Sequence, residues 1–294
     1  MPGAARFADF PQTTPAPPRM RVTFVRKTML PGAVAALADS PVALPRENIA
    51  GHIQRLNWLR GHLCRTDHAL ELGCGTGYMI TLPMRTWGYD LVGIDLDDRS
   101  VQLGRELLAC NGLDPGALRM ADLRNLEEAY DAIIASEVLE HLADDDLRPV
   151  LAAIHERLRP GGQLLVTVPN GYGWFELEAA LWFRTGVDRF YRRRRVNRVV
   201  SGIHHVLTRG YVDAVFPSTV ADSPHRQRFT HRSIQRLLTD AGFGIEHIRG
   251  SVLIAGPFSQ LLFTGIDPAM RINATLGRRL PWVAAGFYVA ARRY

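Results

Sequence analysis

The chain has 294 residues, of which 47% are apolar, 22% charged and 9% aromatic. A chain of this length and composition can bury a large core, which excludes an intrinsically disordered protein. The net charge of +6 and the pI of about 9.6 favour acidic partners such as nucleic acid, anionic lipid or phosphorylated substrates.

Cysteine usage and the N-terminal residues indicate a cellular location. The three cysteines, Cys64, Cys74 and Cys110, have no CxxC spacing, so neither a disulfide framework nor a zinc ribbon is expected. This pattern fits a reducing cytoplasm. Residues 1–20 contain five prolines and no apolar run, which argues against a secretory signal. No stretch approaches the roughly 18 apolar residues of a membrane-spanning helix, so we expect a cytoplasmic protein.

The first 40 residues read as a flexible, proline-rich segment, with one short ordered piece expected at 22–25. We place a single folded domain over residues 41–294. Its first helix is expected to follow Arg46, because aliphatic residues recur at helical spacing from Ile49 to Leu63.

Strands and helices then alternate along the chain. The expected strands are 69–72, 91–95, 118–121, 130–135, 163–168, 243–252 and 282–292, and the expected helices are 78–87, 99–110, 144–158 and 231–241. Pro83 is expected to kink the first of these helices, and residues 159–162 form a stop signal after the third. Strands separated by helices of about ten residues indicate βαβ units and a parallel sheet.

A glycine-rich loop follows the first expected strand, in the sequence Glu71-Leu72-Gly73-Cys74-Gly75-Thr76-Gly77. Alternate glycines let the chain turn sharply and let its backbone approach a ligand closely. The helix that follows offers free N–H groups to a carboxylate or phosphate. Asp95 ends the next strand, 22 residues after Gly73, where its carboxylate can accept hydrogen bonds from two ribose hydroxyls.

Two ligand classes use such a loop. A dinucleotide-binding loop needs glycine at the position of Tyr78, so a nicotinamide cofactor is disfavoured. The spacing from Glu71 to Gly77 instead resembles motif I of class I S-adenosylmethionine-dependent methyltransferases. A turn that binds nothing is the remaining alternative.

The resemblance covers about residues 46–169 and, more loosely, the last two strands. It implies a Rossmann-like α/β fold, with a seven-stranded, mostly parallel sheet, helices on both faces and a helical lid insertion. In this family an acid such as Asp122 lies near the adenine amino group, and the end of the fourth strand, Ser136-Glu137, borders the reacting methyl group. The cofactor residues that the resemblance implies for S-adenosyl-L-methionine are Glu71, Gly73, Cys74, Gly75, Thr76, Gly77, Asp95, Leu96, Asp122, Leu123, Ser136 and Glu137.

The segment Glu137-Val138-Leu139-Glu140-His141 carries the candidate chemistry. On a helix, positions 137, 140 and 141 would project from one face. Two carboxylates and an imidazole could hold a hard cation such as Mg²⁺, which would lower the pKa of an acceptor oxygen. Without a metal, His141 could act as a general base and Glu140 could favour the helix dipole. Glu140 and His141 are therefore the catalytic candidates.

The pairing of E-x-x-E-H at 137–141 with H-x-x-x-F at 225–229 resembles two methyltransferase groups. These are the O-methyltransferases of ubiquinone biosynthesis, which act on catechol intermediates, and the small-RNA 2′-O-methyltransferases, which act on a terminal ribose. In both, the resemblance implies a metal held by Glu137, Glu140, His141 and His225. The segment from Arg55 to Arg60 also resembles a helix of the quinone enzymes whose second arginine contacts the cofactor, which makes Arg60 a cofactor candidate.

The lid insertion is expected at residues 171–224, where the alternation stops. Its first half is aromatic, and between Arg184 and Arg209 it has eight arginines against one acid. Three interpretations stay open: a helical cap with a solvated basic face, peripheral contact of 184–209 with an anionic membrane, or a less favoured nucleic-acid surface. His204 and His205 could be further ligands or surface residues.

The expected reaction is methyl transfer to an oxygen of a small lipophilic or phenolic molecule. RNA 2′-O-ribose methylation is the alternative, and the oligomeric state is not specified by the sequence.

Overall fold

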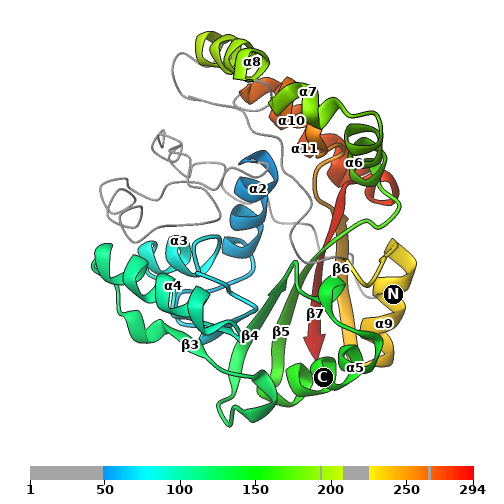
Figure 1. Cartoon of the computed structure of the whole chain (residues 1–294). Coiled ribbons are helices and arrows are strands. Elements are labelled where there is room, and N and C mark those ends of the chain that lie inside the picture. The colour runs from blue at the N-terminus through cyan, green and yellow to red at the C-terminus, as the bar shows by residue number, and fades with distance from the viewer. Residues whose placement is uncertain (1–48, 193, 208–224, 264–265) are drawn as a thin grey trace.

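The computed structural model describes residues 49–192, 194–207, 225–263 and 266–294. The expected flexible segment 1–40, the domain start at 41 and the lid residues 208–224 lie outside these ranges and stay predictions. Figure 1 shows one twisted sheet flanked by helices, with further helices gathered beyond one end of the strands.

Seven strands form one sheet in the order β3-β2-β1-β4-β5-β7-β6. The first five in this order run parallel, whereas β7 is antiparallel to both β5 and β6. The strands are β1 (Ala69–Leu72), β2 (Leu91–Asp95), β3 (Leu118–Met120), β4 (Tyr130–Ser136), β5 (Leu158–Pro169), β6 (Phe243–Gly250) and β7 (Gly286–Arg293). The expected seven-stranded, mostly parallel sheet is confirmed.

Ten described α-helices accompany this sheet, some on its two faces and others beyond the strand ends. They are α2 (Ile49–Arg60), α3 (Thr81–Thr86), α4 (Asp98–Cys110), α5 (Asp144–Arg157), α6 (Trp174–Arg184), α7 (Val187–Arg192), α8 (Arg194–Leu207), α9 (His231–Asp240), α10 (Pro257–Phe263) and α11 (Asp267–Arg279). Because successive strand residues point to opposite faces, Ile133 and Leu164 pack with α5 and α9, whereas Ile134 and Leu165 pack with α2 and α3. All four are fully buried, which explains why these strands read as continuous apolar runs.

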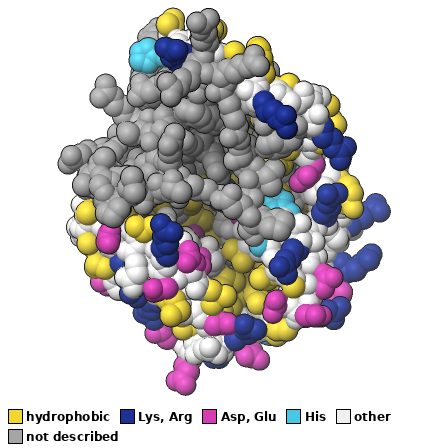
Figure 2. Space-filling model, viewed as in Figure 1, with side chains coloured by type: hydrophobic (Ala, Val, Ile, Leu, Met, Phe, Trp, Pro, Cys, Tyr) yellow, Lys and Arg dark blue, Asp and Glu magenta, His cyan; other side chains and the backbone are white. Residues whose placement is uncertain are grey.

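A helical cap lies beyond the carboxyl ends of the parallel strands and consists of α6, α7, α8, α10 and α11 (Figure 1). The buried carboxylate of Glu178 in α6 accepts a hydrogen bond of 2.9 Å from the backbone N–H of Ser259 in α10, and a second one from the Ser259 hydroxyl. Apolar and basic side chains lie next to one another on the described part of the cap (Figure 2). Within the described ranges, no helix is both long and apolar enough to span a bilayer.

Several expected boundaries differ from the structure. The chain stays non-helical from the glycine loop to Ile80, whose φ is −133° and ψ is −55°. α3 therefore begins at Thr81 rather than at 78. Pro83 therefore lies in the first helical turn, where a backbone N–H has no helical partner, and it does not interrupt the helix.

The ends of the last expected strands also differ. The expected stop signal at 159–162 is part of β5, which begins at Leu158 and has a shift of register opposite Tyr130 and Ala132. β7 begins at Gly286 rather than at Trp282, because residues 281–283 form a 3-10 turn. The helices α10 and α11 between β6 and β7 were not anticipated.

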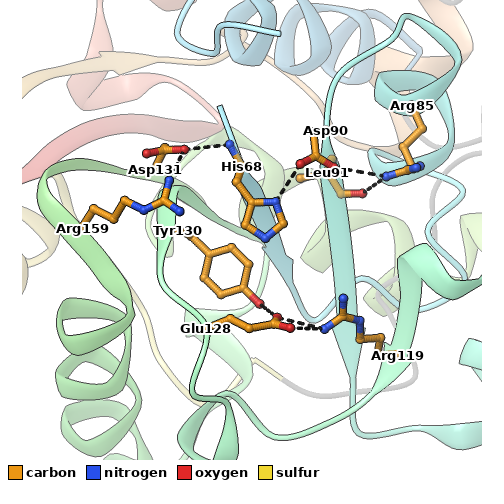
Figure 3. A network of polar contacts seen from close by, with 9 residues as sticks. All are labelled: His68, Arg85, Asp90, Leu91, Arg119, Glu128, Tyr130, Asp131 and Arg159. Atoms are coloured by element: carbon orange, nitrogen blue, oxygen red, sulfur yellow. Dashed lines mark hydrogen bonds and ion pairs between the residues drawn. The ribbon is translucent and has the colours of Figure 1, made fainter. Parts of the chain in front are cut away.

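A polar network ties the strands together at the edge opposite the glycine loop (Figure 3). The backbone N–H of His68 donates to Asp131 Oδ2 at 2.8 Å, and His68 Nδ1 lies 2.7 Å from Asp90 Oδ2. Arg159 pairs with the same Asp131 at 2.6 Å. Each contact is partly exposed and contributes little alone, but together they connect the starts of β1, β2, β4 and β5.

Gly104→Ala is expected to lower the free energy of unfolding by about 1–3 kcal/mol in a urea titration. A Cβ at Gly104 in α4 would lie 2.5 Å from the Thr76 carbonyl oxygen and 2.5 Å from Leu118 Cδ1. The matched control is Gly202→Ala in α8, where nothing lies within 4 Å of the added Cβ. That helical substitution should stabilise by about 0.5–1 kcal/mol, and an equal loss in both variants would contradict the packing argument.

Candidate functional site

The glycine loop, residues 73–77, lies where the strand order reverses between β1 and its neighbours β2 and β4. Ligands of open α/β sheets bind at such a point, outside the carboxyl ends of the strands. Gly73, Gly75 and Gly77 have φ values of 66°, 54° and 65°, which glycine adopts without strain. A Cβ on Gly73 would lie 2.7 Å from Val138 Cγ2, so this glycine lets the loop pack against the segment that follows β4.

Glu71 lies just before the loop and is buried. Its Oε2 accepts a 2.5 Å hydrogen bond from the Thr81 hydroxyl of α3. Burial raises the pKa of Glu71 to about 7, although the Thr81 bond and the charge of Arg55 act in the opposite direction. Cys74, which lies within the loop, is also buried. Its backbone N–H donates to the Ile94 carbonyl at 3.0 Å.

Asp95 ends β2 and has both carboxylate oxygens fixed by the backbone. The Gly75 N–H donates to Oδ2 at 2.6 Å and the Asp97 N–H donates to Oδ1 at 2.9 Å. Each oxygen keeps a further lone pair for the hydroxyls of a ligand. Leu96 beside it is 69% exposed, so it offers an apolar surface next to this carboxylate.

Asp122 follows β3, close to Asp95, since the Ala121 N–H donates to the Asp95 carbonyl at 3.1 Å. Its carboxylate is engaged by the Arg124 guanidinium, with Nε 3.0 Å from each oxygen. That hydrogen-bonded ion pair lowers the pKa of Asp122. The Leu123 side chain is buried in the core, which leaves its backbone as the part that could contact a ligand.

Ser136 at the end of β4 begins a short chain of hydrogen bonds. Its Oγ accepts from Arg55 Nη1 at 2.8 Å and lies 2.8 Å from Thr167 Oγ1. The Thr167 hydroxyl in turn donates to Glu137 Oε1 at 2.8 Å. A side chain of α2 is thereby connected to the end of β4 through a hydroxyl of β5.

The structure places Arg55, rather than Arg60, among the expected cofactor residues. The Arg60 guanidinium lies over the Trp87 ring, 4.9 Å from its centroid, at the end of α3 remote from the glycine loop. Arg55 lies more than one turn earlier in α2 and reaches Ser136. The quoted motif contains both arginines, but only the position of α2 on the sheet decides which of them faces the site.

Glu137 corrects the expected helix at 137–141. Its φ is 56°, the only positive value of a non-glycine residue in the described ranges, and such a conformation costs about 1–3 kcal/mol. The Glu137 N–H donates to the Thr167 carbonyl at 2.8 Å, which holds this conformation. Only Leu139–His141 form a 3-10 turn, so the three side chains do not share one helical face.

Glu140, His141 and His225 nevertheless form a cluster in which one potential ligand atom from each residue lies within 4.8 Å of the others. His225 reaches it because the N–H groups of Arg226 and Gln227 donate to the Glu140 carbonyl, at 2.8 and 3.0 Å. Glu137 is not a member of the cluster. Three of the four expected metal ligands are thus brought together.

Glu176 of α6 was missed by the sequence reading. Its Oε1 lies 3.8 Å from His225 Nδ1, close enough for an ion pair when this imidazole is protonated. Nothing in the sequence around Glu176 distinguishes it from a surface residue of a helix. His204 lies outside the cluster, with its Nε2 against the Leu261 carbonyl of α10.

The Glu140 side chain is only 1% exposed, and its two carboxylate oxygens have no hydrogen-bond partner among the described protein atoms. Burial and then the charge of Glu137 raise its pKa well above the usual range. A cation bound beside His141 and His225 would compensate this carboxylate, so the residues fit a divalent metal. One carboxylate and two imidazoles supply more nitrogen than the oxygen-rich sets typical of Mg²⁺.

The stability of the metal-free protein should fall as the pH rises above the ordinary carboxyl range. The folded state holds the protons of Glu71 and Glu140 more tightly than the unfolded chain does, so unfolding releases protons and stability declines as the pH rises. Glu140→Gln should show a shallower decline between pH 5 and 8 in thermal unfolding. The control is Glu156→Gln at an exposed site of α5, and an unchanged slope in Glu140→Gln would contradict this reading.

Comparisons with known proteins agree with this geometry. The family described as a methyltransferase domain matches residues 46–248, more than half of the chain. The ubiquinone biosynthesis O-methyltransferase of Mesorhizobium japonicum is 35% identical over 104 residues, which are 34% of this chain and 40% of that protein. The ribosomal protein L11 methyltransferase of Azotobacter vinelandii is 29% identical over 140 residues, or 47% and 46% of the two chains. These curated relatives are each matched over less than half of their length.

Two solved structures share the fold. Magnesium protoporphyrin IX methyltransferase from Synechocystis, with bound S-adenosylhomocysteine, has a TM-score of 0.50 at 14% identity and covers 84% of this chain and 85% of its own. A glycopeptide N-methyltransferase complexed with the same compound has a TM-score of 0.50 at 17% identity, covering 83% and 90%.

Proposed function

We propose, since this chain belongs to the methyltransferase domain family and is a class I S-adenosylmethionine-dependent methyltransferase, that it methylates an oxygen of a small lipophilic or phenolic acceptor. The observation that carries this proposal is the buried Glu140 carboxylate with two imidazoles beside the glycine loop. The partial match to ubiquinone biosynthesis O-methyltransferases supports the same acceptor class.

The cofactor would lie across the carboxyl ends of β1, β2 and β4. Asp95 would accept from its ribose hydroxyls, and the exposed Leu96 would pack against its adenine. Arg55 would supply positive charge for its methionine carboxylate, whereas Arg60 was the arginine expected to contact the cofactor. Asp122 would reach the adenine amino group, and the ends of the loop and of β4 would enclose the sulfonium.

The transfer itself breaks the bond from sulfur to the methyl carbon and forms a bond from that carbon to the acceptor oxygen. The products are a methyl ether and S-adenosylhomocysteine. Alignment of the acceptor with the methyl group supplies most of the rate enhancement, because the sulfonium is already activated. Without a bound metal, His141 would take the acceptor proton, and Glu140 would favour the protonated imidazole, with their nearest atoms 3.9 Å apart.

A divalent cation held by Glu140, His141 and His225 would polarise the acceptor oxygen and lower its pKa when bound. Mg²⁺ is the expected ion. Because the donor set is rich in nitrogen, the activity assay must include Mn²⁺ as well. Glu176 would lie beside the metal-bound His225 ring. Glu137 would stay with Thr167 and border the methyl group.

The acceptor class also bears on the partners of the protein. A lipophilic acceptor resides in membranes, so the proposal includes peripheral contact between an anionic bilayer and segment 184–209. The structure describes residues 184–192 and 194–207 of this segment. RNA 2′-O-ribose methylation, the alternative, would use the same cluster on a terminal ribose and is a separate outcome of the assay below.

Asp95→Ala is expected to weaken binding of S-adenosylmethionine by about 100-fold or more in isothermal titration calorimetry. The substitution removes charged hydrogen bonds to the ribose, each worth about 1.5–3 kcal/mol, together with the acceptor that holds the Gly75 N–H. Asp98→Ala removes an exposed acid from the first turn of α4 and should keep the affinity. Equal affinities for all three proteins would overturn the cofactor placement.

The test of the function is methyl transfer from labelled S-adenosylmethionine to separate lipid, small-molecule and RNA pools, with Mg²⁺, Mn²⁺ or a chelator. We expect label as a methyl ether in the lipid or small-molecule pool, a fall with chelator, and no metal response in Glu140→Gln. Glu156→Gln is the matched control. Label as 2′-O-methylribose would contradict the acceptor class, and full activity of Glu140→Gln with chelator would end the metal proposal.

A further inference from the structure

Helix α8 presents its apolar side chains to solvent. Val199, Ile203, Val206 and Leu207 are 62%, 53%, 76% and 62% exposed. Their spacing of i, i+4, i+7 and i+8 places them on one face of the helix. We call these four residues the α8 stripe.

Two polar side chains on another side of α8 are buried. Ser201 is 9% exposed and His204 is 3% exposed, and His204 Nε2 contacts the Leu261 carbonyl of α10. A helix on the surface of a soluble protein normally has the reverse orientation, with its apolar face toward the core. α8 therefore has polar side chains that could face solvent, but it buries Ser201 and His204 and exposes the stripe instead.

The charges around the stripe are positive. α8 contains no acidic residue. Arg198 in α8 is exposed, and so is Arg189 in α7, the helix that packs against α8. A continuous aliphatic face bordered by arginines is typical of helices that lie in the headgroup region of anionic membranes.

The place of α8 in the fold agrees with such a role. It forms the outer part of the helical cap, beyond the carboxyl ends of the strands, the same end at which the site lies (Figure 1). Basic and apolar side chains lie close together on the described surface of the cap (Figure 2). An acceptor leaving the membrane beneath α8 would enter on the side of the protein that holds the glycine loop.

We propose that α8 docks on an anionic lipid bilayer, with the α8 stripe among the upper acyl chains and the neighbouring arginines at the lipid phosphates. The inference rests on the proposed function only in the choice of a lipophilic acceptor. A second copy of the chain is a weaker match, because a symmetric contact through α8 would oppose arginines to arginines. The stripe is aliphatic, and single-stranded nucleic acid would need aromatic side chains for stacking.

The experiment is flotation of the full chain with vesicles of phosphatidylcholine alone or with 30% phosphatidylglycerol. Ile203→Glu combined with Val206→Glu should lower binding to the anionic vesicles about tenfold or more, because it places two carboxylates in the membrane-facing stripe. Tyr294→Glu is the matched control, since Tyr294 is 82% exposed at the end of β7 away from the cap. Equal binding by the double variant and the wild type would overturn the proposal.

Two further measurements separate the possible failures. Calorimetry with S-adenosylmethionine should give the same affinity for the double variant and the wild type, which would show that folding and the proposed cofactor site are intact. Raising the salt from 0.05 to 0.5 M should release wild-type protein from anionic vesicles, and this readout does not depend on any variant. A wild-type protein that ignores both vesicle types, or whose mass in light scattering doubles unless the stripe is substituted, would contradict membrane docking.

Discussion

The candidate site depends on the close packing of Gly73 against Val138. Any side chain at Gly73 would collide with Val138 Cγ2, so the glycine loop and the segment after β4 can lie together only because this position has no Cβ. The same packing holds residues 137–141 beside the loop that begins α3. In this segment Glu137 has a positive φ. The Glu140 carbonyl accepts the two backbone hydrogen bonds that hold the segment carrying His225.

That packing buries carboxyl groups near the glycine loop. Glu71 and Glu140 are both buried, and burial raises the pKa of each. Arg55 is the cation that α2 contributes, and it lowers the pKa of both carboxyls without cancelling the effect of burial. The surplus of carboxylates is a reason for this site to bind cations, since a sulfonium or a metal ion would be attracted where water is excluded.

Local spacing made much of this predictable. The glycine loop, Asp95 and the order of strands follow from residues a few positions apart, and the structure brings them together as expected. Arg55, Thr167 and Glu176 were not found, because each becomes part of the site only through the placement of a distant helix or strand. The helix expected at 137–141 was wrong because the periodicity of side chains does not reveal a residue in the left-handed region. The cap helices α10 and α11 were not anticipated.

The construction of the cap limits how acceptor specificity could be transferred from a related enzyme. Its helices come from two stretches of chain, one after β5 and one after β6, and the buried Glu178 carboxylate joins them through Ser259. A chimera that received only the first stretch from a related enzyme would leave one partner of this contact buried and unsatisfied. A new acceptor preference would therefore require compatible substitutions in both stretches. The two connections are then expected to evolve together.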